Sequence, residues 1–335
     1  MSARYVVRRL AYFVVVLLAM TVVMFVISHV IPGDPAAAMA GFGAPKYVID
    51  SVRHQLGLDR PLHEQYFAYM RDLLHGDLGV SIARRTRVNN DIARYLPASA
   101  ELVLAALFMS VPLAVMCGII SAASWRRWPD ITLRMLSLLG ACVPMFWLGL
   151  IFQLIFYRAL PFFPAGGRIA DSILPPPVIT GFLTVDSVMT GNWAALGSAL
   201  HHIFLPAFTL ALNSLGLLLR QTRASMLMVL SHDYVRTARA KGLAEQVVLW
   251  RHAFKNAAIP VVTEIGLQFG ILLGATFLVE IVFYWPGLGF YAVRAIPDLD
   301  FPAIMAVTLI YTLIYLAMNF LVDLIYPLLD PTVTD

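Results

Sequence analysis

Apolar residues along this chain gather in six long runs, separated by segments in which charged residues, proline and glycine are frequent. The runs cover residues 10–31, 100–123, 132–157, 203–226, 259–283 and 303–328. A helix needs about 20 apolar residues to cross the roughly 30 Å hydrocarbon layer of a membrane. The pattern therefore predicts an all-α polytopic membrane protein with six transmembrane helices.

The first run follows Arg4, Arg8 and Arg9, so it could instead be the core of a cleaved signal peptide. Signal-peptide cores have about 7–15 residues, whereas this run has about 22. We therefore expect an uncleaved anchor. Pro112 and Pro144 lie inside the second and third runs and are expected to kink those helices.

The polar segments divide the chain into three parts. We expect an N-terminal tail and first span over 1–31, an extracytoplasmic segment over 32–98, and a core over 99–335 that holds spans two to six. Two stretches of the extracytoplasmic segment, starting near residues 44 and 61, have helical spacing. The segment 158–202 is rich in proline and glycine, and we expect a short helix and loops there.

The basic residues near the span ends set the orientation. With the N-terminus inside the cell, the cytoplasmic segments hold the arginines before span one, three arginines between 126 and 134, and seven basic residues between 220 and 255. The long segment 32–98 carries eight basic and seven acidic residues. Long segments translocate largely regardless of charge, so both termini are expected in the cytoplasm.

Composition agrees with a membrane protein. The chain is 60% hydrophobic and 13% charged, against about 45–50% and 25% in soluble domains. The net charge of +4 is modest and no water-facing basic domain is evident, so nucleic acid is not an expected partner. Cys117 and Cys142 lie in apolar runs and are interpreted as small buried side chains.

The cytoplasmic segment at about 231–258 holds the most informative pattern. From Leu243, apolar residues recur at Val247, Trp250 and Phe254, which is one stripe of a helix, and Gly242 precedes them as a hinge or cap. A short amphipathic helix is therefore expected. It could lie among lipid headgroups or dock into a groove of a partner protein, and the pattern alone leaves both open.

Motifs along almost the whole chain resemble one transporter family. They are "RYVVRRL" at 4–10, "IPGDP" at 31–35, "LGLDRPL" at 56–62, "HGDLGVS" at 75–81, "LPASAEL" at 96–102, "TRASML" at 222–227, "DYVRTARAKGL" at 233–243, "VEIVFYWPGLG" at 279–289 and "LVDLIYPLLDP" at 321–331. In this order and spacing they resemble the permeases of peptide/nickel ATP-binding-cassette importers. The segment 158–202 is most similar to the dipeptide branch, in its B-type subunit.

The resemblance implies a type I importer permease of the bacterial inner membrane. It further implies a second homologous permease, two cytoplasmic ATPase subunits, an extracytoplasmic solute-binding protein and a peptide substrate. The cytoplasmic segment would then be a coupling loop that seats on an ATPase subunit. Its coupling residues would be Arg236, Thr237, Ala238, Arg239, Ala240, Lys241, Gly242, Leu243, Val247, Trp250 and Phe254.

The loop departs from the widespread importer pattern, which begins Glu-Ala-Ala. Arg236, Thr237 and Ala238 stand at those places, while Gly242 matches. The chain has three lysines, and none completes a glycine-rich phosphate loop followed by Ser or Thr. No ATPase site, bound cofactor or metal site is therefore expected in this chain, and ATP and Mg²⁺ would be bound by the partner subunits.

Polar residues inside the apolar runs are candidates for the translocation path, because charges in the bilayer usually face a cavity or a partner. They are Asn213, Glu264, Gln268 and Glu280. Each could instead join helices, and Glu264 could pair with an arginine of the loop. Gly266, Gly270 and Gly274 are spaced for close helix packing.

A secondary transporter driven by an ion gradient is the alternative function. Glu264 and Asp323 would then be proton or sodium sites. The absence of an obvious inverted repeat and the coupling-type loop favour the ATP-driven importer.

Overall fold

The computed structural model describes residues 3–30, 34–41 and 43–329. Within these ranges the regular secondary structure is helical, apart from one isolated β-bridge between Val80 and Arg87. The helices are α1 (Ala3–Val30), α2 (Pro35–Ala40), α3 (Lys46–Gln55), α4 (Leu62–Leu74), α5 (Val88–Ala123), α6 (Trp128–Cys142), α7 (Met145–Gln153), the π-helix η1 (Leu154–Ala159), α8 (Leu183–Met189), α9 (Trp193–Leu230), α10 (Asp233–Ala240), α11 (Glu245–Val247), the π-helix η2 (Val248–Phe254), α12 (Lys255–Val282), α13 (Leu288–Ala295) and α14 (Phe301–Leu329).

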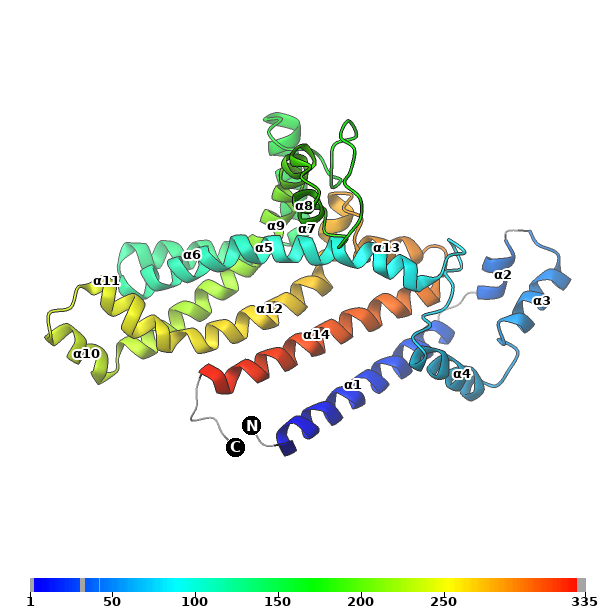
Figure 1. Ribbon diagram of the computed structural model, residues 1–335, viewed down its shortest axis with the longest axis horizontal. Coiled ribbons are helices and arrows are strands. Elements are labelled where there is room, and N and C mark those ends of the chain that lie inside the picture. Colours follow the sequence, from blue (N-terminus) through cyan, green and yellow to red (C-terminus); the bar gives the residue numbers. More distant parts are fainter. Residues whose placement is uncertain (1–2, 31–33, 42, 330–335) are drawn as a thin grey trace.

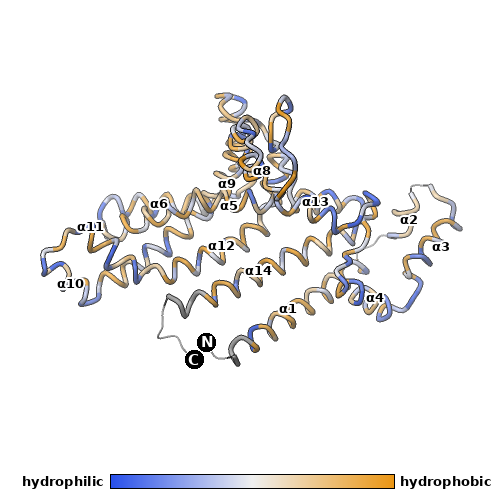
Figure 2. The backbone as a smooth tube through the Cα atoms, viewed as in Figure 1, coloured by the Kyte–Doolittle hydropathy of each residue, from blue (hydrophilic) through white to orange (hydrophobic). Residues whose placement is uncertain are grey.

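Four long helices form the centre of the molecule. α5 packs on α9, α9 on α12, and α12 on α14, while α1 lies at the margin against α14 (Figure 1). The long helices are mostly apolar along their length, whereas polar residues gather around α10 and around α3 and α4, towards opposite ends of the molecule (Figure 2). This is the distribution expected of a bundle that crosses a membrane.

Within the described residues, five helices are long and apolar enough to span a membrane, and a sixth crossing is present if α6 and α7 count as one broken span. The prediction of an all-α protein with six spans therefore holds in this form. α5 and α9 begin about ten residues before the predicted spans, at Val88 and Trp193. The expected boundary at residues 98–99 thus falls inside a helix, because hydropathy detects only the apolar part of each helix.

The third predicted span, over 132–157, is divided at Pro144, where a kink was expected. α6 and α7 meet at an angle of 95°. Pro144 lacks an N–H for helix pairing and forces the preceding Val143 out of the helical region, to φ −85° and ψ 127°. The expected kink is therefore a complete break. At Pro112 the helix α5 continues uninterrupted.

Glycines set the close packing of the bundle. A Cβ on Gly118 of α5 would lie 2.5 Å from the Cβ of Thr222 on α9, and one on Gly270 of α12 would lie 2.6 Å from Cδ2 of Tyr315 on α14. Gly266 also lies directly against α14, whereas Gly274 faces open space. The predicted glycine contacts are therefore present at two of the three positions.

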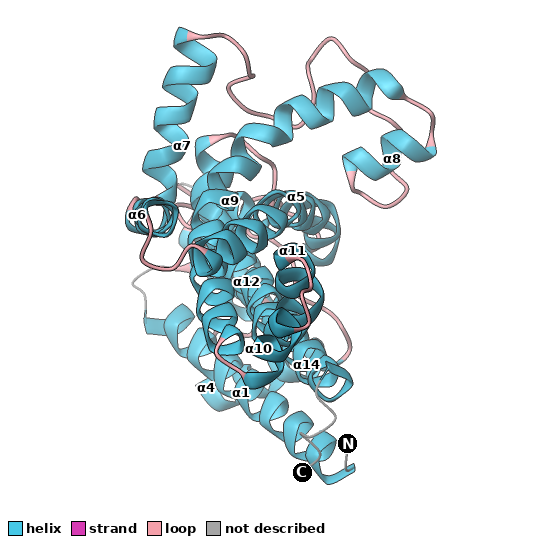
Figure 3. Ribbon diagram, turned by 90° about the vertical axis from the view of Figure 1, so that its left-hand side faces the viewer, coloured by secondary structure: helices cyan, strands magenta, loops and turns pink. Residues whose placement is uncertain are grey.

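The two stretches of 32–98 that were expected to be helical are α3 and α4. A lobe made of α7, η1, α8 and the start of α9 projects from one side of the bundle (Figure 3). α8 is the short helix expected within 158–202.

The start of α1 is joined to the last part of α14. Arg9 of α1 forms an ion pair with Asp323 of α14 at 2.9 Å. The start of α1 and the end of α14 therefore lie together, as an even number of crossings requires.

Candidate functional site: a coupling loop and intramembrane polar groups

The loop between α9 and α12 lies at one end of the bundle and begins with α10 (Figure 1). Gly242 ends this helix: its φ is +73°, and its N–H donates to the carbonyl of Arg239 at 2.9 Å. A left-handed residue just after the last helical turn is the usual helix stop, and glycine adopts it without a Cβ penalty. Gly242 is therefore the left-handed residue that stops α10, one position after its C-cap residue Lys241.

An ion pair closes the same turn. The guanidinium of Arg239 donates to both carboxylate oxygens of Glu245, at 2.7 and 3.1 Å. The hydrogen-bonded Glu245 carboxylate raises the pKa of Arg239. The sequence analysis missed this ion pair because its two residues are six positions apart, whereas side chains that meet on a helix are three or four positions apart.

The expected separate helix from Leu243 to Phe254 is not present. Leu243 lies in the turn, and the following residues form α11 and η2, which run directly into α12. The separate amphipathic helix is instead α10, which carries Arg236, Thr237, Ala238, Arg239 and Ala240, and Lys241 follows at its C-terminal cap. The π-helical turn of η2 alters the stripe, because it has more residues per turn than an α-helix.

The stripe residues nevertheless form an exposed surface. Leu243, Val247 and Trp250 are 40%, 40% and 47% exposed, while Phe254 packs inward. The loop's own core lies on the opposite face, where Val235, Ala238, Val248 and Ala253 bury themselves against α5 and α9. The loop is thus a folded unit that is held to the bundle by one apolar face and leaves a second apolar face uncovered.

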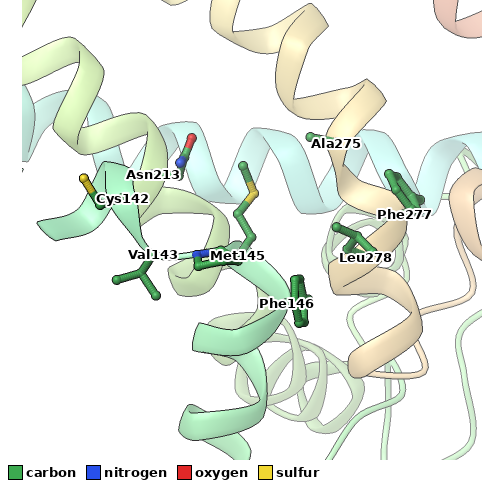
Figure 4. Close-up of a pocket in the computed structure, with 9 residues that line it drawn as sticks. Cys142, Val143, Met145, Phe146, Asn213, Ala275, Phe277 and Leu278 are labelled. Carbon is green, nitrogen blue, oxygen red and sulfur yellow. The ribbon is translucent and has the colours of Figure 1, made fainter. Parts of the chain in front are cut away.

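Asn213, from α9, lies at an open hollow of about 290 Å³ between α6, α7, α9 and α12 (Figure 4). The other residues of the hollow are Cys142, Val143, Pro144, Met145, Phe146, Ala275, Phe277 and Leu278. Cys142 is exposed, which corrects the expectation that it is buried. The break at Pro144 contributes to the wall of this hollow, since the residues on either side of it, from Cys142 to Phe146, line the hollow.

Glu264 and Gln268 lie one turn apart on α12. Gln268 donates to a carboxylate oxygen of Glu264 at 2.8 Å, and its own side-chain oxygen is buried without a partner among the described residues. The expected pairing of Glu264 with an arginine is not present within the described part of the chain. Glu264 is half-buried, so one side of this polar pair is accessible.

Glu280 lies 16 residues further along α12, about 24 Å from Glu264. It is fully buried and accepts hydrogen bonds from the Ser99 hydroxyl at 2.6 Å and the Phe290 N–H at 2.8 Å. These contacts join α12 to α5 and to the start of α13. The surroundings of Glu280 support a role in joining helices rather than in lining a path.

Two charged networks escaped the sequence analysis. Glu101 of α5 pairs with Arg168 and accepts hydrogen bonds from the Thr184 hydroxyl and N–H, which fastens the lobe to the bundle. Asp130 of α6 pairs with Arg223 of α9. In both networks the paired residues are far apart in the sequence, so no local spacing pattern predicts these ion pairs.

Asp186 organises the lobe itself. Burial alone would raise its pKa, but hydrogen bonds from the hydroxyl and N–H of Thr180 and from the neighbouring N–H groups of Ile179 and Gly181 outweigh burial and hold the pKa below its usual range. Among the described residues, no three His, Cys, Asp or Glu side chains come together as metal ligands.

Comparison with known proteins resolves the family. Residues 114–335 match the family described as "Binding-protein-dependent transport system inner membrane component", and residues 2–113 match the N-terminal part of such membrane components. The chain belongs to this permease family. It is therefore an inner-membrane transport component and not an enzyme, as the motifs indicated.

Relatives that match over almost the whole chain show which branch of the family it resembles. The permease is 42% identical to the probable D,D-dipeptide transport system permease protein DdpB of Escherichia coli, over 96% of this chain and 94% of the relative. It is 39% identical to the dipeptide transport system permease protein DppB of Alkalihalophilus pseudofirmus, over 98% of both chains. It is also 39% identical to a glutathione transport system permease protein, GsiC, of Salmonella choleraesuis, over 98% of both chains. The resemblance to the peptide branch is confirmed.

Proposed function

We propose that this permease forms half of the pore of an ATP-binding-cassette importer that takes up di- or oligopeptides. Two separate cytoplasmic ATPase subunits, a second permease and an extracytoplasmic binding protein complete the transporter. The relatives named for dipeptides and glutathione support a small peptide as substrate.

One observation carries the proposed coupling: the loop leaves Leu243, Val247 and Trp250 uncovered beside α10. A folded loop with an uncovered apolar face at a water-facing end is suited to a groove on a partner protein. The fixed turn at Gly242 and the Arg239–Glu245 pair give that face one shape, so that movement of a bound ATPase subunit is transmitted to α9 and α12. This proposal favours docking over a position among lipid headgroups.

The translocation path is proposed to include Asn213, Glu264 and Gln268. Asn213 lies at a hollow, and Glu264 presents a carboxylate without an ion-pair partner among the described residues. A carboxylate can attract the ammonium group of a peptide passing along α12. Glu280 is left out of this path because it is enclosed between helices.

Co-purification and uptake test the proposal together. The permease is expressed with its predicted partner subunits and reconstituted into proteoliposomes with the ATPase subunits facing the lumen. Peptide uptake is then measured with and without ATP enclosed in the lumen. ATP-dependent uptake and retention of the ATPase subunits are expected. Uptake that continues without ATP and stops when a proton or sodium gradient is collapsed would favour the gradient-driven alternative.

A further inference from the structure

Three arginines converge on a hollow between α6 and α9 that the proposed transport path does not use. The hollow has a volume of about 330 Å³ and is lined by Arg134, Ser137, Leu138, Arg220 and Arg223. α6 lies at the edge of the bundle, where Figure 3 shows it end-on. The hollow therefore opens near the margin of the chain and not in its core.

Close packing of the two helices positions these side chains. A Cβ on Gly216 of α9 would lie 2.6 Å from the carbonyl oxygen of Ser137 on α6, so this position admits only glycine without a shift. One turn further along α9, Arg220 reaches the same carbonyl and donates to it at 3.1 Å. The guanidinium of Arg220 is thus held at the wall of the hollow by a neutral group.

The hollow carries excess positive charge. Asp130 is the acid beside it, and its carboxylate accepts hydrogen bonds from Arg223 at 2.6 and 2.9 Å, from Ser121 at 2.6 Å and from the Arg126 N–H at 3.0 Å. Asp130 therefore neutralises the charge of Arg223, and both of its carboxylate oxygens are already occupied by hydrogen bonds. Among the described residues, no acidic group pairs with Arg134 or Arg220.

The surroundings of the hollow are those of a membrane surface. Trp125 and Trp128, just before and at the start of α6, are 53% and 77% exposed. Exposed tryptophans are typical of the headgroup level. Beyond them, α6 exposes a set of apolar side chains: Ile131, Met135, Leu138 and Leu139. The turn between α5 and α6 lies towards the same end of the bundle as α10 (Figure 1).

We propose that Arg134 and Arg220 bind the phosphate of an anionic phospholipid from the cytoplasmic leaflet. Guanidinium groups suit phosphate because they donate paired hydrogen bonds, and basic pockets between membrane helices bind anionic headgroups. The exposed apolar face of α6 provides a surface for the acyl chains. This face favours a lipid over a free anion, which has no apolar part to bury.

The test uses the assembled transporter in mild detergent, titrated with phosphatidylglycerol and followed by native mass spectrometry. The double variant Arg134→Gln/Arg220→Gln is expected to bind the lipid on the order of thirtyfold more weakly, since it loses two charged contacts. Arg223 stays unchanged because it holds Asp130. The matched control is Arg127→Gln, an exposed arginine at the N-cap of α6 that does not line the hollow. Its affinity should change less than threefold.

Other lipids, free phosphate and a single variant decide whether the hollow binds an anionic phospholipid. Phosphatidylcholine should bind the native protein and the double variant equally. If the double variant keeps the native affinity for phosphatidylglycerol, the proposal is wrong. If inorganic phosphate displaces the lipid at equal concentration, the site takes a soluble anion and the lipid assignment fails. Should the double variant not fold, the exposed Arg134→Gln alone is expected to weaken binding about fivefold, and an unchanged affinity overturns the proposal.

Discussion

The turn at Gly242 offers a sharp test of how the loop works, because its requirement is conformational and not steric. The residue has φ +73°, and apart from its two chain neighbours no described residue has an atom within 4 Å of the place where a Cβ would stand. A side chain there meets no neighbour within this chain. A loss that follows the order of left-handed strain among the substituted residues therefore reports the backbone and not a clash within this chain.

That strain differs between residue types in a known order. Alanine in the left-handed region is disfavoured by about 1–2 kcal/mol, and a β-branched residue such as valine by more, up to about 3 kcal/mol. Asparagine tolerates this region. A penalty of about 1 kcal/mol lowers the population of the observed turn roughly fivefold. Gly242→Asn should therefore resemble the native protein, Gly242→Ala should be weakened, and Gly242→Val should be weakest.

The assay is ATP-driven peptide uptake by the assembled transporter, together with the amount of ATPase subunit that co-purifies. Gly197→Ala is the matched control, since Gly197 also has open space around it but lies within α9 with an ordinary helical backbone. That variant should keep full uptake. If Gly242→Val transports as well as the native protein, the fixed turn is not required. If Gly242→Asn fails as badly as Gly242→Val, backbone strain is not the cause.

Three further predictions concern packing, pH and docking. Gly216→Ala should destabilise the permease by about 1–3 kcal/mol through overpacking, and an unchanged thermal unfolding temperature in detergent would contradict the α6–α9 contact. The contribution of Asp186 to lobe stability should be full at neutral pH and lost only as pH falls below about 4, because its folded pKa is lowered; protease protection of the lobe measures this, and Asp186→Asn should remove the pH dependence together with the protection. Trp250→Glu should abolish ATPase co-purification and uptake while membrane insertion stays normal, and retained uptake would show that this surface does not dock.

Hydropathy predicted the number and approximate place of the helices because apolar length is a local property. The same signal missed the early starts at Val88 and Trp193, since the first turns of those helices are polar or lie in the lobe. It also predicted a kink at Pro144, where the structure has a complete break between α6 and α7. A proline in an apolar run can be accommodated, as at Pro112, or can break the helix, and neighbouring contacts decide between the two outcomes.

The candidate site was predictable only in part for a similar reason. The loop, its glycine and its exposed apolar residues follow from a short stretch of sequence. The π-helical turn of η2 changes which residues face outward, and no periodicity argument based on 3.6 residues per turn detects it. Contacts such as Glu101 with Arg168 join residues far apart in the chain, so the sequence alone provides no sign of them.

The position of α1 has a consequence for how the protein is made. Only 6% of its apolar stretch is buried, and its bundle neighbour is α14, which it meets through Arg9 with Asp323 and Phe13 with Phe320. Because α1 precedes α14 in the chain, α1 finds this bundle neighbour only after the intervening helices and α14 have been translated. A chain that lacks α14 would leave the apolar stretch of α1 without its contacts to the bundle.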